Sequence, residues 1–284
     1  MATTKEVFAF LNQEFVPLQN AFLHVSDLAI QRGYGIFDFL KIQNGHPFFI
    51  DEYLNRFYRS AELMELTVPY PIEALKEIVQ ELIQKNSLEL SGLKLILTGG
   101  YSPDGYTPKE PNLLLMQQEM LLPDKAQYEQ GIKIITHSYV REMPTVKTIN
   151  YTMGIRLIKK IKEQHAGDVL YYNNGVVTEF PRCNFFIVKP DNTVVTPARD
   201  VLSGITRKNV LNLAEQKFKT ETTDISLNDV YGAKEAFLTS TTKRIMPIVQ
   251  IDEKTIGDGK PGEVTLALLE ELISLENKDL AGSV

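Results

Sequence analysis

The stretch VREMPTVKTINYTMG, residues 140–154, decides how the rest of the chain is interpreted. It places Lys147 between an expected strand at 131–140 and an expected helix at 152–167. A lysine in such a loop is usually a solvated surface residue. The other interpretation is an amine held for covalent chemistry, which requires burial or a neighbouring cation to lower the lysine pKa. The remaining sequence has to distinguish the two.

Composition and charge argue against several classes of protein. A chain of 284 residues with 43% hydrophobic and 23% charged residues is typical of globular proteins. The net charge of −6 and the lack of a basic run with interleaved aromatics argue against nucleic-acid binding. One cysteine, Cys183, allows no internal disulfide, and the scattered histidines predict no metal site. With no signal-peptide pattern and no long apolar run, we expect a cytoplasmic protein without membrane contact.

The hydrophobic pattern predicts an α+β fold of two domains. We expect a small N-terminal domain at 1–119, a linker at 120–126 and a larger C-terminal domain at 127–284. Each domain mixes strand-like runs with helices of apolar period 3.6. Neither a Rossmann glycine motif nor a P-loop occurs, so the two common nucleotide-binding folds are not expected.

Four local signals mark the expected element boundaries. Asn44-Gly45 predicts a tight hairpin turn. Asp51 is the expected N-cap of the helix that follows, and Pro71 is expected to begin the next one. Gly167 is expected to end the helix after the lysine segment.

Three further features could carry chemistry. Glu179 stands where a β-branched strand breaks at Pro181, and a carboxylate there could hold a ring nitrogen protonated. The stretches SGITR (203–207) and TSTTK (239–243) offer hydroxyls, backbone amides and a helix start that suit an anion. Taken singly, a surface glutamate and plain helix capping are the commoner interpretations.

Arg56, on the first long helix, completes the set. Its forked donors suit a phosphate, although a solvated arginine paired with Glu52 is the commoner case. Together, a reactive amine, a carboxylate and several anion-binding elements are what pyridoxal 5′-phosphate requires. Its aldehyde forms a Schiff base, its ring nitrogen draws electrons and its phosphate anchors it.

The order of these motifs resembles a known family, the class IV or fold-type IV pyridoxal-phosphate enzymes. This family includes branched-chain aminotransferases, D-amino acid aminotransferases and aminodeoxychorismate lyases. The resemblance extends over residues 32–248 and rests on RGYGIFDFLKI, DEYLNRFYRSAEL, VKTINY, NGVVTEFPRCNFF, SGITRKNV and TSTTKRIMPI. It implies a two-domain fold like that of D-amino acid aminotransferases, and a homodimer in which loops of the partner close an active site at the domain junction.

The resemblance also implies roles for individual residues. Lys147 would form the Schiff base and move the Cα proton of the substrate. Tyr151 would face the phenolic oxygen of the cofactor, and Glu179 would pair with its pyridine nitrogen. The phosphate would be bound by Arg56, Ile205, Thr206 and Thr241, with Gly204 allowing close backbone approach.

Several positions depart from the family pattern where the substrate would bind. In D-amino acid aminotransferases an arginine and a histidine trap the substrate carboxylate, and Asp104 and Tyr106 stand at the matching positions. Asp104 would repel a carboxylate. Phe37 replaces a frequent carboxylate-binding tyrosine, and Asp38 replaces a frequent glutamate.

Arg141 and Thr242 are the remaining candidates for substrate binding. Arg141 lies six residues before Lys147, and a simply solvated arginine is an equally good interpretation. The resemblance implies an aminotransferase that moves an amino group between an amino acid and a 2-oxo acid. The alternatives are 4-amino-4-deoxychorismate lyase, which releases pyruvate, and a binding protein that has kept the scaffold without catalysis.

Overall fold

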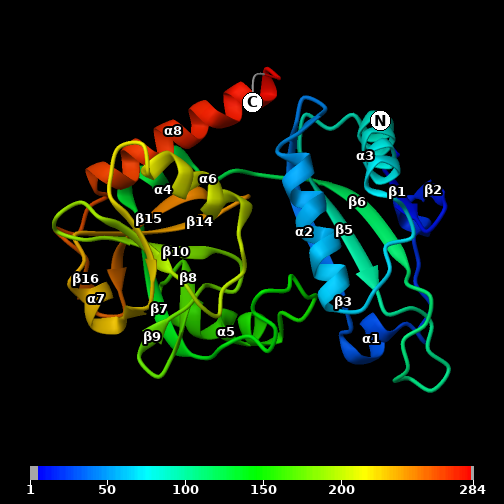
Figure 1. Cartoon of the computed structure of the whole chain (residues 1–284), viewed down its shortest axis with the longest axis horizontal. Helices are drawn as coiled ribbons and strands as arrows, with labels where there is room; N and C mark the ends of the chain where they lie inside the picture. The colour runs from blue at the N-terminus through cyan, green and yellow to red at the C-terminus, as the bar shows by residue number, and fades with distance from the viewer. Residues whose placement is uncertain (1–5, 283–284) are drawn as a thin grey trace. The chain divides into compact units, whose positions relative to one another are not determined.

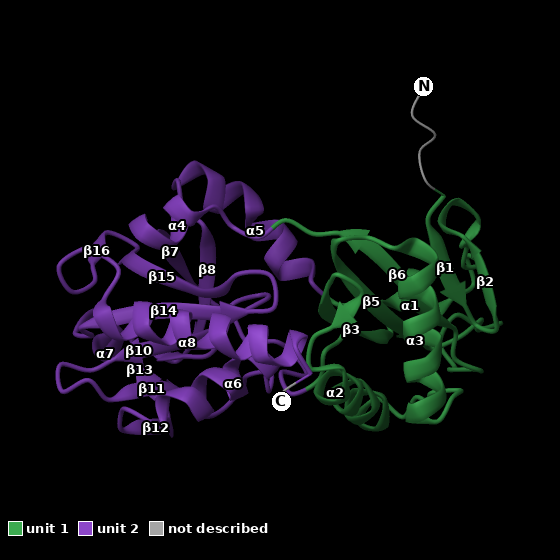
Figure 2. Ribbon diagram, turned by 90° about the horizontal axis from the view of Figure 1, so that it is seen from above, with its two compact units in different colours: residues 1–121, 146–150 green, residues 122–145, 151–284 purple. Residues whose placement is uncertain are grey.

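The computed structural model describes residues 6–282, which form two compact units (Figures 1 and 2). The first unit contains the chain up to residue 121 together with residues 146–150. The second contains residues 122–145 and the chain from residue 151 onward. The lysine segment therefore groups with the first unit, whereas the sequence-based division counted it with the C-terminal domain.

The first unit is built on a six-stranded antiparallel sheet in the order β2-β1-β6-β5-β3-β4. The strands are β1 Phe8–Leu11, β2 Glu14–Pro17, β3 Gly35–Gln43, β4 His46–Pro47, β5 Leu90–Thr98 and β6 Leu113–Glu119. Asn44 and Gly45 join β3 to β4 with φ angles of 51° and 80°. The hairpin predicted at these two residues is thus confirmed.

Two long helices, α2 (Ile50–Leu63) and α3 (Ile72–Asn86), cover one face of this sheet (Figure 1). Their apolar sides pack against strand residues such as Leu40 and Leu95, which are fully buried. The short helices η1 (Leu18–Asn20) and α1 (Leu28–Arg32) precede β3. Along β3 the side chains alternate, so that Asp38 is fully buried on the covered side while Phe37 is half-buried on the other.

One helix start was predicted correctly and one was not. Helix α3 begins directly after Pro71, as expected. Helix α2 begins at Ile50 behind Phe49, whose φ of 51° turns the chain into the helix. Asp51 therefore lies inside the first turn and is not the N-cap, although its negative charge still favours that helix end.

The second unit contains a ten-stranded mixed sheet in the order β12-β11-β10-β14-β15-β7-β8-β9-β13, with β16 paired to β15. Its strands are β7 Ile132–Ser138, β8 Asp168–Asn173, β9 Val176–Val177, β10 Asn184–Val188, β11 Val194–Pro197, β12 Thr220–Thr223, β13 Ile225–Ser226, β14 Glu235–Ser240, β15 Arg244–Ile251 and β16 Lys254–Thr255. The helices are α4 Lys125–Gln130, α5 Thr152–Glu163, α6 Ile205–Ala214, α7 Leu227–Tyr231 and α8 Glu263–Leu280.

Helices pack on this sheet through apolar clusters. Helices α6 and α8 contact a cluster around Phe186 and Phe237, whose rings stack with centroids 4.8 Å apart. Helix α5 packs on a cluster that includes Val169 and Tyr171 of β8. None of the helices within residues 6–282 is long and apolar enough to cross a membrane.

Two expectations for the second unit need correction. Helix α5 ends at Glu163, so Gly167 does not end it. The backbone N–H of Gly167 instead donates to the Lys133 carbonyl at 2.7 Å, which sets the start of β8 beside β7. Helix α4 begins at Lys125, inside the linker expected at 120–126, and its start is tied by the Asp124 N–H donating to the Gln127 side chain at 3.2 Å.

The sheet of the first unit yields a test of packing at Gly92. A Cβ atom there would overlap the ring of Phe39, which lies across the glycine. We expect Gly92→Ala to lower the free energy of unfolding by about 1–3 kcal/mol, the range typical of overpacking. Urea denaturation measures the change. In a Phe39→Leu background the smaller side chain leaves room, so an equal loss in both backgrounds would contradict this explanation.

Candidate active site

The backbone of Lys147 is fixed by the start of strand β3. The Lys147 carbonyl accepts from the Phe37 N–H at 2.9 Å, and the Ile149 N–H donates to the Gly35 carbonyl at 3.1 Å. A bridge between Ile36 and Thr148 lies between these bonds. The lysine segment is therefore an added antiparallel stretch along the start of β3, which holds Lys147 at a defined position.

The amine of Lys147 lies against an aromatic ring. Its Nζ is 4.7 Å from the centroid of Phe37, within the range of a cation–π contact. The Lys147 N–H also lies 3.4 Å from the Ser60 Oγ of α2. The Phe37 side chain, predicted as a substrate residue, is thus brought to the predicted catalytic amine.

Arg56 makes a two-pronged ion pair with Asp38. Arg56 Nε donates to Asp38 Oδ2 at 2.9 Å and Nη2 donates to Oδ1 at 2.6 Å. The Asp38 side chain is fully buried and that of Arg56 is 10% exposed. Asp38 Oδ1 also accepts from the Phe39 N–H at 2.7 Å. The commoner case considered for Arg56, a solvated arginine, is wrong, because its guanidinium is buried and oriented by a carboxylate.

The second unit holds the buried carboxylate of Glu179. Its Oε1 accepts from Arg141 Nε at 2.7 Å and its Oε2 accepts from the Leu202 N–H at 2.9 Å. The Glu179 carbonyl accepts from the Tyr171 N–H at 2.9 Å, which extends the pairing with β8 beyond the end of β9. The surface-glutamate interpretation is therefore wrong, since the side chain is only 5% exposed.

The same backbone segment that binds Glu179 also starts α6. Gly204 is the N-cap of this helix, and as a glycine it has no side chain to cap it. A Cβ at Gly204 would overlap the Asn184 side chain, whose Nδ2 donates to the Leu202 carbonyl at 2.8 Å. The first amides of α6, beginning at Ile205 and Thr206, have no intrahelical acceptor and lie next to the residue that binds the carboxylate.

The turn at Thr241-Thr242 is anchored by two residues that the sequence analysis did not single out. Lys243 Nζ donates to Asp168 Oδ2 at 2.9 Å, and the Lys243 N–H donates to Ser240 Oγ at 3.1 Å. The signal that could have revealed Lys243 is its place directly after the hydroxyl-rich run.

Burial, with the nearby charge of Asp168, raises the pKa of Cys183 to about 11, so this thiol is no nucleophile at neutral pH.

The loop at 99–111 is organised by Asp104. Its carboxylate accepts from the Thr107 hydroxyl at 2.6 Å, the Thr107 N–H at 2.8 Å, the Ser102 hydroxyl at 2.8 Å and the Tyr106 N–H at 2.9 Å. These bonds, led by that of the Thr107 hydroxyl, hold the Asp104 pKa below its usual value. Asp104 was considered only for its charge; the structure shows that it shapes the loop. Tyr106 is 81% exposed on the same loop.

Tyr151 stands at the N-cap of α5, and its carbonyl accepts from the Ile155 N–H at 3.0 Å. It directly follows Asn150, the last residue of the lysine segment. The predicted helix after that segment therefore begins within one residue of where the sequence placed it.

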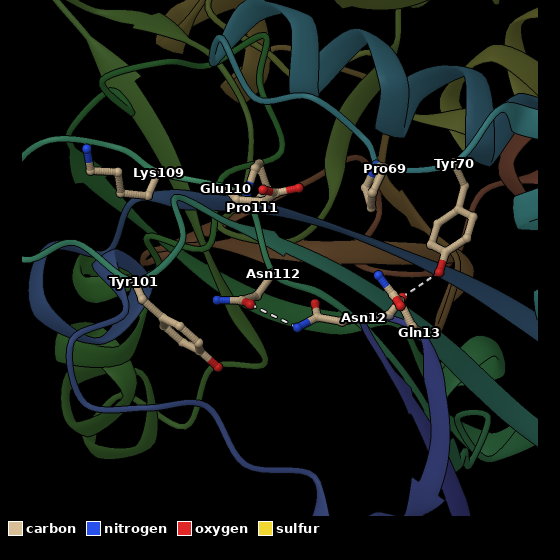
Figure 3. A pocket seen from close by; sticks show the side chains of 9 residues that line it. All are labelled: Asn12, Gln13, Pro69, Tyr70, Tyr101, Lys109, Glu110, Pro111 and Asn112. Atoms are coloured by element: carbon tan, nitrogen blue, oxygen red, sulfur yellow. Dashed lines mark hydrogen bonds between the residues drawn. The ribbon is translucent and has the colours of Figure 1, made fainter.

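A hollow of about 590 Å³ lies in the first unit (Figure 3). It is lined by Asn12, Gln13, Pro69, Tyr70, Tyr101, Lys109, Glu110, Pro111 and Asn112. Asn12 Nδ2 donates to Asn112 Oδ1 at 3.0 Å across its floor (Figure 3). None of the residues predicted for the active site is among those that line it.

Comparison with known proteins decides the family. The family described as amino-transferase class IV matches residues 35–251. The chain belongs to this family. It is 30% identical to a D-alanine aminotransferase of Listeria monocytogenes over 91% of its length and 92% of that protein. It is 31% identical to a putative branched-chain-amino-acid aminotransferase of Methanocaldococcus jannaschii over 95% of its length and 96% of that protein.

A solved structure extends the match to the fold. The branched-chain amino acid aminotransferase from Escherichia coli has a TM-score of 0.87 at 23% identity, covering 96% of this chain and 95% of that one. The class IV chain is therefore an aminotransferase, and like its family it depends on pyridoxal phosphate. The relatives named here are aminotransferases, and nothing observed favours the lyase.

The second unit fits this cofactor. The carboxylate of Glu179 and the glycine-capped start of α6 meet on one segment, through Leu202 and Gly204. A carboxylate suits a protonated pyridine nitrogen, and helix amides suit a phosphate. Asn184 fills the space beneath Gly204, so the backbone is firmly supported at this point.

The contacts of Asp104 yield a test of loop order. We expect Asp104→Ala to lower the hydrogen-exchange protection of the Tyr106 and Thr107 amides, because both donate to this carboxylate. Since its folded pKa is below the unfolded value, the wild-type protection should be present above about pH 4 and decline as the pH falls below it. Glu110→Ala removes a charge from the same loop as a control. Equal protection in Asp104→Ala and wild type would refute the role.

Proposed function

We propose that Lys147 is the catalytic amine of this aminotransferase and that Glu179 binds the pyridine nitrogen of the same cofactor. The observation that supports this most directly is that a buried carboxylate and the glycine-capped start of α6 meet on the segment Leu202–Gly204. When bound, pyridoxal phosphate supplies an aldehyde that reacts with amines and a ring that withdraws electrons. In this proposal Lys147, whose backbone is fixed by its bonds to β3, is the amine that would react with that aldehyde.

The other residues take supporting roles in this proposal. Arg56, oriented by Asp38, would bind the phosphate together with the backbone at Ile205 and the hydroxyls of Thr206 and Thr241. Tyr151 at the start of α5 would hold the phenolic oxygen. Lys147 Nζ would also act as the general base that removes the proton from the substrate Cα.

For the substrates we propose an α-amino acid with an apolar side chain and a 2-oxo acid. The Phe37 ring beside the Lys147 amine supports this, as do relatives named for D-alanine and for branched-chain amino acids. The amide of Thr242 and the hydroxyl of Tyr106 would contribute on the substrate side. An arginine-histidine carboxylate trap is replaced by Asp104 and Tyr106.

We further propose that the enzyme works as a homodimer in the cytoplasm. Several apolar side chains of the first unit are exposed, notably Phe22 at 73%, Val25 at 70% and Ile30 at 57%. A second copy of the chain would remove them from water. A lone buried cysteine agrees with a reducing compartment.

The amine is tested by Lys147→Ala. We expect kcat to fall by about 10²- to 10⁴-fold or more, because both the nucleophile and the general base are lost. The purified variant should still bind pyridoxal phosphate. Borohydride should fix the cofactor covalently onto the peptide that contains Lys147 in wild type and not in the variant. Lys159→Ala, which removes an exposed lysine of α5, is the control. Wild-type turnover in Lys147→Ala would disprove the assignment.

The substrate class is tested by a panel of D- and L-amino acids. The stoichiometric release of the 2-oxo acid from enzyme loaded with cofactor reports each half-reaction. We expect alanine and the branched-chain amino acids to react faster than aspartate and glutamate, because an aromatic ring borders the amine. The hand of the reacting amino acid identifies the stereospecificity. Faster release from the acidic amino acids would contradict the apolar substrate class.

A further inference from the structure

Arg141 has a different role from the one its position in the sequence suggested. Six residues before Lys147, it was a candidate to bind the substrate carboxylate. We propose instead that Arg141 is a positioning residue, which holds the Glu179 carboxylate in place for the cofactor ring nitrogen. This inference rests on the proposed role of Glu179.

The contacts of Arg141 are directed inward. Its Nε donates to Glu179 Oε1 at 2.7 Å, and its Nη2 donates to the Pro144 carbonyl at 2.5 Å. The side chain is only 10% exposed. At least two of its nitrogens are therefore engaged in fixing a carboxylate and the local backbone. A substrate carboxylate bound here would have to compete with Glu179 for the same guanidinium.

Burial explains why Glu179 requires this partner. An ionised carboxylate out of water is stable only when a charge and hydrogen-bond donors compensate for its lost hydration. Arg141 supplies the charge and the Leu202 N–H a fixed donor, one to each oxygen. A carboxylate has about four acceptor positions, and these two contacts use one position on each oxygen.

A second arginine, Arg207, is influenced by the charge of Glu179 but directs its hydrogen bonds to other groups. The charge of Glu179 acts on Arg207, but burial has the larger effect and lowers the Arg207 pKa. Arg207 directs its Nε to Thr196 Oγ1 at 3.1 Å and its Nη2 to the Pro197 carbonyl at 3.0 Å. Arg141, by contrast, bonds the carboxylate directly through its guanidinium.

Arg141 also links Glu179 to the chain that leads to the catalytic amine. Pro144, whose carbonyl it binds, lies three residues before Lys147. The guanidinium of Arg141 therefore holds both the Glu179 carboxylate and the backbone at Pro144, just before the lysine segment. Loss of Arg141 should disturb the chemical step more than the capture of the substrate.

The test compares Arg141→Gln with a matched buried pair elsewhere in the same unit. Arg244 pairs with Glu276 through Nε at 2.8 Å and Nη2 at 2.7 Å, with side chains 18% and 10% exposed. Arg244→Gln therefore removes a similar ion pair that has no proposed catalytic part. For each variant we would measure kcat and KM for donor and acceptor, the affinity of the apoprotein for pyridoxal phosphate, and the melting temperature.

We expect Arg141→Gln to lower kcat by about 10- to 100-fold, the loss typical when an outer partner of a functional ligand is removed at metal sites. KM for both substrates should change by less than about twofold, because no substrate contact is lost. The apoprotein should bind pyridoxal phosphate about tenfold more weakly. Arg141→Lys, which keeps the charge, should recover part of kcat. Arg244→Gln should affect only the melting temperature.

Two results would overturn the inference. A KM raised about tenfold or more for both substrates, with kcat preserved, would make Arg141 a substrate-carboxylate binder. Behaviour identical to that of Arg244→Gln would make it a purely structural residue. Should Arg141→Gln not fold, Arg141→Lys carries the same comparison. Glu179→Gln is measured alongside, since wild-type kcat in that variant would refute the proposed role of Glu179 itself, whatever Arg141 does.

Discussion

A carboxylate can be buried beside an apolar sheet only if donors and a cation replace its water, and that requirement shapes the second unit. Glu179 meets it through the Leu202 amide and the Arg141 guanidinium. Leu202 can serve because Asn184 holds its carbonyl, and the chain then turns at Gly204 into α6. The start of this helix is thus placed by the same contacts that neutralise the carboxylate.

In the first unit a buried carboxylate orients a cation, the reverse of the arrangement at Glu179. There a cation, Arg56, is the group to be oriented, and the fully buried Asp38 of β3 orients it with both oxygens. The side-chain alternation along β3 places Asp38 on the face covered by α2 and Phe37 on the other, where the ring meets Lys147. Two adjacent residues of β3 thus contact two different cations, Asp38 the Arg56 guanidinium and Phe37 the Lys147 amine.

Local signals in the sequence predicted what local physics controls. The Asn44-Gly45 hairpin and the start of α3 after Pro71 follow from backbone preferences of those residues alone. The helix boundaries predicted at Asp51 and Gly167 were wrong. Helix α2 begins one residue earlier because of the positive φ of Phe49, and Gly167 bonds the distant Lys133 carbonyl. The candidate residues were recognisable from ordered motifs and residue type. Their partners were not, since Arg141 with Glu179 joins residues 38 positions apart, and no spacing rule encodes such pairs.

The pairing of Lys147 with β3 bears on how the chain matures during synthesis. The first unit receives residues 146–150 only after residues 122–145 have been translated, although its sheet strands are complete by Glu119. During synthesis the N-terminal unit can therefore fold around its own core before the lysine segment pairs with Gly35–Phe37 of β3. The segment that carries Lys147 joins this sheet late, after residues 122–145 of the second unit have been made. A nascent or truncated N-terminal fragment thus lacks the lysine beside β3.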